Sequence, residues 1–403
     1  MSTTASLTVA LDTSKIGRQA MPRKRIQPAI RVDRERDRGR RHGIVVDIVA
    51  GTGRSEMACG DTAGGRPRSM DAAGAVAQAS VPAAPDGPPD LDAFWATTIA
   101  QRRQVPVDLC RSPRPAPSNG TVAHDLAFRS WGGHLLRGYA ITWDDRVPRP
   151  LVVHAHGYRS QTVPRLEWVR AGCHVVGFDI RGFGRSVAAV RAPSPAGWLL
   201  TGAHRPETSV LRGAVCDYVR ATLVARALGV PTLRSVSHGV SLAGGLALMA
   251  EAVAPAADLL VLEVPTFGWV EGRRLLVERG SGAEVAGFLE RHPQYPEDDL
   301  QTVLSYFDAA LLAPAVGCPT VVGLGVIDHV VPFASVQTIV ERLRAPLEVM
   351  TFPVSHDAGP AMRAWDRFDE RWLGLALRGV PSGFGQHEAR GQRSAAASRT
   401  QAR

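Results

Sequence analysis

The sequence has 403 residues, of which 45% are hydrophobic and 6% aromatic, and its formal net charge is +9. This apolar content excludes a chain that is disordered throughout, and the composition excludes a collagen, a coiled coil and a small disulfide-bonded protein. The positive charge belongs to the two ends: residues 1–80 hold 14 Lys and Arg against 8 Asp and Glu, residues 381–403 hold 4 against 1, and residues 81–380 are formally neutral.

Residues 1–80 show no sustained hydrophobic periodicity, and glycines interrupt the few apolar positions. We therefore expect a disordered basic extension without a domain of its own, and Met70 is an alternative start of the chain. A basic tail can bind nucleic acid or an anionic surface. No aromatic residue lies between Arg34 and Arg41 to stack on bases, so we favour a solvated extension without a nucleic-acid partner.

The cysteines and the hydropathy pattern predict the compartment. Five scattered cysteines without a CxxC pair argue against a disulfide framework and a zinc site, so we expect buried free thiols. No cofactor is expected. The sequence contains no run of 18 apolar residues, so it predicts no transmembrane helix. The first residues also lack the apolar core of a secretory signal. We expect a cytoplasmic protein that does not bind membranes.

The folded part is expected to begin near residue 88, after a proline-rich linker, with a helix that Asp90 caps ahead of Leu91, Phe94 and Trp95. From residue 125 onward, strand-like and helix-like segments alternate, which is typical of a parallel sheet covered by helices. The expected strands are 151–155, 175–178, 234–238, 258–263, 320–325 and 347–352. The expected helices are one capped by Thr208 that runs to about residue 228, then 242–253, 268–290, 333–344 and 360–374.

These elements predict one α/β domain over residues 81–380, with a mostly parallel sheet covered by helices on both faces. Residues 381–403 turn to Gly, Arg, Ser and Ala and are expected to form a second disordered basic tail.

Ser241 is the first candidate for chemistry. It lies in the segment 239–243, between the strand at 234–238 and the helix from 242, where a nucleophile needs small residues two before and two after it. Gly239 and Ala243 meet that need. Because Ala replaces the second glycine of GxSxG, the motif alone fits a nucleophile and a structural glycine-rich turn equally well.

A base is expected after the serine and after an acid, in the chain order of α/β-hydrolases. His356 follows the strand at 347–352 in a polar turn, from which a loop can place imidazole over the serine. The other histidines after Ser241 are less well placed: His292 lies in a proline-flanked loop, His329 beside the best acid candidate, and His387 in the tail.

Asp328 is the candidate acid, because it stands just past the strand at 320–325 and before Pro332. A carboxylate there can accept the imidazole hydrogen bond and fix its tautomer. Glu263 and Asp308 are competing acids, for which we favour structural roles such as helix capping or an ion pair.

The oxyanion hole is expected to use two backbone N–H groups, those of Tyr158 and Leu242. Tyr158 follows the strand at 151–155, and Leu242 follows the serine, which are the two places that donate in this fold. For His154, in the same strand, we favour simple packing.

With these residues placed, the chain resembles the acetyl xylan esterase and cephalosporin C deacetylase family of α/β-hydrolases over about residues 88–375. The matching motifs lie far apart and in the same order: Asp92-Ala93-Phe94-Trp95, His156-Gly157-Tyr158, Asp179-Ile180-Arg181-Gly182, Gly197-Trp198, Leu211-Arg212-Gly213, Leu304-Ser305-Tyr306-Phe307-Asp308, Asp328 with Pro332, and His356. The resemblance implies deacetylation of small or oligosaccharide acetyl esters by a metal-free serine mechanism, in a homo-oligomer that is often a hexamer. It implies Ser241 as nucleophile, Asp328 as acid, His356 as base, and Tyr158 and Leu242 as oxyanion donors.

The chain departs from that family at Leu242 and Ala243, where Gln and Gly are usual, and at Arg159, where a small residue is usual. Leu242 either lines the acyl site or packs under the oxyanion loop. The alternatives are a general carboxylesterase, a thioesterase or lactonase on the same triad, and a non-catalytic protein of the same fold.

Overall fold

The computed structural model describes residues 29–31, 47–49, 87–277, 279–356, 362–382 and 384–385. The predictions for most of residues 1–80 and 381–403 therefore lie outside the described residues. The chain divides into two units, Met1–Pro82 and Ala83–Arg403. In the first unit, β1 (Ala29–Arg31) and β2 (Asp47–Val49) pair as a short antiparallel ladder.

The second unit is built on a sheet that has nine strands among the described residues, in the order β11-β10-β9-β8-β6-β7-β5-β4-β3. Strands β6 to β11 run parallel to one another, and β5, β4 and β3 extend the sheet with antiparallel pairs. The strands are β3 (Cys110–Arg114), β4 (Thr121–Arg129), β5 (Leu135–Trp143), β6 (Arg149–Ala155), β7 (His174–Phe178), β8 (Thr232–Val240), β9 (Leu259–Glu263), β10 (Thr320–Ile327) and β11 (Leu347–Val354).

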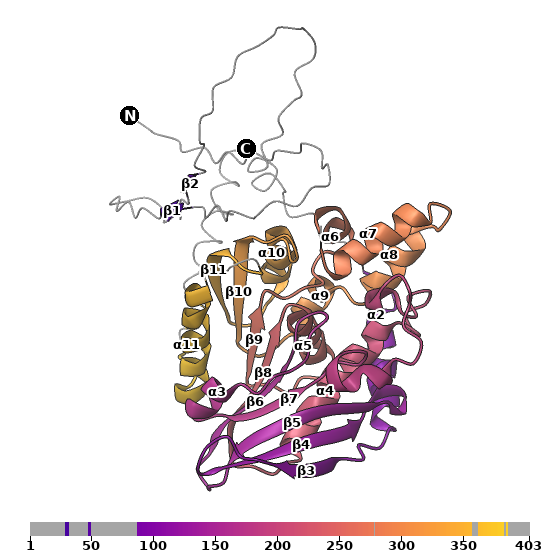
Figure 1. The fold of residues 1–403 in the computed structure, drawn as a ribbon. Helices are drawn as coiled ribbons and strands as arrows, with labels where there is room; N and C mark the ends of the chain where they lie inside the picture. The colour runs from indigo at the N-terminus through magenta and orange to yellow at the C-terminus, as the bar shows by residue number, and fades with distance from the viewer. Residues whose placement is uncertain are drawn as a thin grey trace, which may run out of the picture. The chain divides into compact units, whose positions relative to one another are not determined.

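The helices alternate with the parallel strands, as the sequence pattern predicts (Figure 1). The α-helices of this unit are α2 (Leu91–Arg103), α3 (Leu166–Arg170), α4 (Val210–Arg226), α5 (Leu242–Val253), α6 (Val270–Leu276), α7 (Ser281–Arg291), α8 (Glu297–Ser305), α9 (Ala309–Leu312), α10 (Phe333–Arg342) and α11 (Met362–Arg378). The short 3-10 helices are η1 (Trp131–Gly133), η2 (Gly184–Ala189), η3 (Trp198–Leu200) and η4 (Ala313–Ala315).

Two apolar clusters cover the two faces of the sheet. Alternate residues of β9 point to opposite sides, so that Leu260 and Leu262 join the cluster that includes α4 and α5, and Leu259 and Val261 join the cluster that includes α3 and α11. In Figure 1, α3 and α11 lie together at the left, against the strands. The expected α/β-hydrolase architecture, with helices on both faces of a mostly parallel sheet, is confirmed.

Four local predictions were wrong. Asp90 stands at the N-cap position of α2, but its side chain makes no capping hydrogen bond. The helix expected over 268–290 is two helices, α6 and α7, because the chain turns at Gly280 with φ of 72°. Ser209, not Thr208, caps α4, since its hydroxyl accepts from Leu211 N at 3.3 Å. The thiols of Cys173 and Cys216 are buried and free, but Cys110 is exposed on β3 and Cys318 is half-buried.

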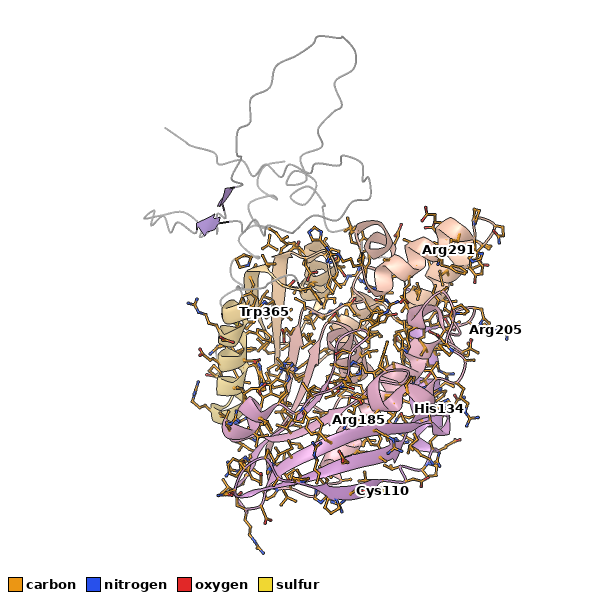
Figure 2. The ribbon with its side chains drawn as sticks, in the orientation of Figure 1. Cys110, His134, Arg185, Arg205, Arg291 and Trp365 are labelled. Atoms are coloured by element: carbon orange, nitrogen blue, oxygen red, sulfur yellow. The ribbon has the colours of Figure 1, made fainter. Side chains whose placement is uncertain are left out.

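The sheet ends at β3, whose residues are exposed apart from the partly buried Arg114. Cys110, at the start of this strand, lies at the bottom of the molecule in Figure 2. The strand contains Pro113 between Arg111 and Arg114.

No helix among the described residues is long and apolar enough to cross a membrane.

Candidate active site

Ser241 stands alone between β8 and α5, with φ of 53° and ψ of −111°. A non-glycine residue rarely adopts positive φ, and a sharp strand-to-helix turn is a place that requires it. A Cβ atom on Gly239 would collide with the backbone oxygen of Ala243, which explains the glycine two positions before the serine. Ala243 is fully buried, so the methyl group fits where the motif usually has glycine.

The turn is fixed to the next strand. Ser241 N donates to Glu263 O at 2.8 Å, and Ser241 O accepts from Thr266 N at 3.1 Å. These bonds join the turn to the end of β9 and to the segment that follows it. The strained backbone of Ser241 is therefore held from both sides.

Asp328 and His356 are joined directly: His356 Nδ1 lies 2.7 Å from Asp328 Oδ2. Asp328 follows β10 and its side chain is fully buried, whereas His356 follows β11 and its side chain is 24% exposed. Burial acts to raise the pKa of Asp328, but the hydrogen bonds from His356 and Ser355 outweigh burial and hold the pKa below the usual value. The carboxylate thus stays ionised beside imidazole.

The end of β11 is held in place by α11. Trp365, labelled in Figure 2, packs on Phe352 with the ring centres 4.1 Å apart. Its Nε1 donates to Val354 O at 3.3 Å. His356 follows two residues later. The hydrogen bonds of the described residues do not include one from Ser241 Oγ to His356, and in unliganded enzymes this contact is often long.

The two predicted oxyanion donors flank the serine. Among the described residues, neither Tyr158 N nor Leu242 N donates to a carbonyl or a side chain. Ala155, at the end of β6, pairs with Gly239 of β8, so the loop after β6 and the serine turn meet at the same edge of the sheet. A Cβ atom on Gly157 would lie 3.9 Å from Ser241 Cβ, which places this loop in contact with the serine.

His156 positions this loop, a role that sequence reasoning did not assign. Its Nδ1 lies 2.7 Å from Gly157 O, and its Nε2 accepts from Ile180 N at 3.1 Å. Burial lowers the pKa of His156, so the neutral ring donates from Nδ1 and accepts at Nε2. His154, as expected, packs inside the strand layer, where Nε2 lies 2.6 Å from Tyr139 Oη.

Glu284 of α7 is a second residue that sequence reasoning missed. Its carboxylate accepts from the Tyr158 hydroxyl, from Arg159 Nη2 at 3.1 Å and from Leu199 N at 3.2 Å. A Cβ atom on Gly197 would collide with this carboxyl group, so the glycine leaves the space that Glu284 fills. Burial and the contact with Glu284 raise the pKa of Tyr158, which keeps the phenol protonated.

The competing acids take other positions. Asp308 caps α9 by accepting from Ala310 N at 2.8 Å and also accepts from Val270 N at 2.8 Å. Glu263 is partly buried at the end of β9, where burial and the nearby Asp369 raise its pKa to about 7 although His356 acts to lower it. Of these three acids, Asp328 is therefore the one that accepts the hydrogen bond from the imidazole of His356.

The remaining candidates take other positions. Leu242 is only 1% exposed and belongs to the apolar cluster around α5, in agreement with packing and not with an exposed acyl wall. His292 contacts the ring of Phe288, and His329 follows Asp328 in the chain. His387 lies outside the described residues. No group of three or more His, Cys, Asp or Glu side chains is placed to hold a metal ion in the described part of the chain.

Comparison with known proteins identifies a family. A family model of acetyl xylan esterases matches residues 82–368. The fold is similar to that of an acetyl xylan esterase from Paenibacillus sp. R4, at 22% identity and a TM-score of 0.64 over 72% of this chain and 96% of that one. It is also similar to acetyl xylan esterase 1 from Thermoanaerobacterium sp. JW/SL YS485, at 20% identity and a TM-score of 0.61 over 70% and 94%.

Proposed function

Because the chain belongs to the acetyl xylan esterase family and is thus a carboxylester hydrolase that acts on acetyl esters, we propose that Ser241, His356 and Asp328 form its catalytic triad. The proposed substrates are small or oligosaccharide acetyl esters, cleaved through a covalent acetyl-serine.

In the first step, His356 Nε2 takes the proton of Ser241 Oγ as the oxygen attacks the carbonyl carbon of the acetyl group. The negative charge that develops on the carbonyl oxygen is stabilised by the N–H groups of Tyr158 and Leu242. His356 then gives the proton to the leaving alcohol, and the C–O bond breaks. Water repeats the sequence on the acetyl-serine and releases acetate.

The observation that carries this proposal is the hydrogen bond between His356 and the buried Asp328. It leaves Nε2 as the free nitrogen of the ring, and it orders the base at the edge of the sheet where Ser241 stands. The N–H groups of Tyr158 and Leu242, which donate to no acceptor in the part of the chain that the structure describes, would supply donors at that edge.

The proposal is tested by labelling with a fluorophosphonate probe, followed by mass mapping of the modified peptide. We expect one label, on Ser241, and none in Ser241→Ala. The hydrolysis of 4-nitrophenyl acetate and of an acetylated xylo-oligosaccharide is measured in parallel. A folded protein that neither reacts with the probe nor cleaves either ester would support a non-catalytic role instead.

We also propose that the acetyl esters accepted include cephalosporin C, that the enzyme is cytoplasmic and that it assembles as a homo-oligomer. The free buried thiols of Cys173 and Cys216 fit a reducing compartment. The motifs shared with the family support the other two statements. Deacetylation of cephalosporin C, cell fractionation and sedimentation test them separately.

A further inference from the structure

The carboxylate of Asp328 receives more hydrogen bonds than the one from His356. Val330 N and Val331 N donate to Oδ1 at 2.7 and 2.8 Å. The hydroxyl of Ser355 donates to Oδ2, the same oxygen that accepts from His356. Each carboxylate oxygen therefore accepts two hydrogen bonds, and together these four bonds fix the orientation of the carboxylate plane.

Ser355 reaches this oxygen because the adjacent strand leaves room. Ser355 is 7% exposed and directly precedes His356. On β10, a Cβ atom at Gly325 would collide with the Ser355 side chain. A larger residue at 325 would displace the hydroxyl from Asp328.

We propose that Ser355 is a positioning residue of the reaction, which fixes the Asp328 carboxylate and thereby orients His356 toward Ser241. This inference rests on the proposed function of the triad. The Ser355 hydroxyl contacts neither imidazole nor the nucleophile in the hydrogen bonds of the described residues, so it acts through Asp328 alone.

Ser355 also sets how strongly the carboxylate interacts with imidazolium. A hydroxyl that donates to Oδ2 takes up part of the negative charge that His356 faces. Without it, that oxygen interacts more strongly with the imidazolium that forms during the reaction.

Other charged groups lie near the pair, and a substitution of Ser355 leaves them in place. Glu263, at the end of β9, interacts with His356. Asp369 of α11 and Arg165, just before α3, act in turn on Glu263. A change in the pH profile of a Ser355 variant therefore reports the lost hydroxyl.

The experiment measures kcat and KM for 4-nitrophenyl acetate from pH 5 to 9 in the full-length wild type, Ser355→Ala and Ser355→Thr. We expect Ser355→Ala to lose about tenfold in kcat, with KM within about twofold, because a hydrogen bond to a charged group is removed away from the substrate. The acidic limb of kcat/KM should move to higher pH. Ser355→Thr, which keeps the hydroxyl, should restore the wild-type limb.

Ser335→Ala is the matched control, because Ser335 is fully buried and its hydroxyl donates to Gly268 O at 2.6 Å. It should lower the melting temperature and leave the pH profile unchanged. If Ser355→Ala does not fold, Ser355→Cys replaces the hydroxyl by a somewhat larger thiol that is a weak donor, and it should show the same shift.

Asp328→Asn separates this inference from the proposed function. If Asp328→Asn is as active as the wild type, the triad assignment fails and the role of Ser355 with it. If Asp328→Asn is inactive while the folded Ser355 variants keep the wild-type kcat and pH profile, only the positioning role is overturned. A loss of kcat in Ser355→Ala without a shift of the acidic limb of kcat/KM would also overturn the positioning role.

Discussion

The hydroxyl of Tyr158 donates a hydrogen bond to the carboxylate of Glu284, which lies 126 residues further along the chain. This bond ties the loop of one proposed oxyanion donor to α7. The guanidinium of Arg159 contacts the same carboxylate and lies 5.5 Å from the centre of the Tyr158 ring. The loop that contains Tyr158 and Arg159 is therefore held by a helix that belongs to a different part of the sequence.

Tyr158→Phe should lower kcat about tenfold, because the backbone donor remains and only the anchoring hydrogen bond to a charged group is lost. Glu284→Ala should cost more, since Arg159 and Leu199 N also lose their acceptor. The double variant should be no slower than Glu284→Ala alone, since both changes break one interaction. Kinetics on 4-nitrophenyl acetate check this prediction. The control is Tyr295→Phe, at a tyrosine between α7 and α8 that packs against Phe288. Fully additive losses would contradict the prediction.

Ser241→Ala and His356→Ala should each remove nearly all esterase turnover, by about 10⁴-fold or more, because nucleophile and base act as a unit. Circular dichroism verifies that both variants fold. His292→Ala, at a histidine that we do not place in the triad, should keep the wild-type rate. Half the wild-type rate in Ser241→Ala would show that the nucleophile is another residue.

Asp328→Asn should be severely impaired, whereas Glu263→Gln should mainly change stability. The pKa of Glu263 is raised to about 7, so the folded protein binds a proton there that the unfolded chain, with its ordinary value near 4.5, has released. The contribution of Glu263 to the free energy of unfolding thus falls as pH rises from 4.5 through 7. The melting temperature of Glu263→Gln minus that of the wild type should therefore be larger at pH 8 than at pH 5. If Glu263→Gln loses activity and Asp328→Asn keeps it, the acid is Glu263.

Deletion of residues 1–80 should leave folding and activity unchanged, since the segment has too little apolar periodicity to offset the entropy of ordering it. The family match begins at residue 82. Thermal melting and ester hydrolysis of the shortened chain check this prediction. Insolubility, or a melting temperature many degrees lower, would refute it.

Acetyl esters should exceed octanoyl esters in kcat/KM by well over tenfold, because the family implies an acyl site closed around a two-carbon group, where extra methylenes are costly. Leu242 is buried in the core, so we do not expect its side chain to change the size of that acyl site. A series of 4-nitrophenyl acetate, butyrate and octanoate measures the preference. Comparable efficiency on octanoate would identify a general carboxylesterase.

The sequence predicts those parts of the fold that depend on local patterns. The parallel strands are short apolar runs, because both faces of each are covered, and His174–Phe178 is buried throughout. The serine turn is equally local, since its backbone demands small residues at fixed offsets. Each of these features shows in a window of a few residues.

Tertiary contacts between distant segments are the part that the sequence does not predict. Glu284 and Tyr158 are far apart in the chain, and nothing in the pattern around either residue indicates the other. Apolar spacing continued across Gly280, so the break between α6 and α7 depended on a backbone angle that periodicity does not report. The role of Ser355 depends likewise on the space left by Gly325 on the neighbouring strand.

Strand β3 has a consequence for solubility and assembly. An open edge of a sheet is a template on which strands of other molecules can add, and proline and charged side chains are the usual protection. Pro113 has no N–H to offer an incoming strand, and Arg111 and Arg114 on either side would bring like charges together if two copies met edge to edge. This border therefore opposes growth of the sheet from one molecule into the next.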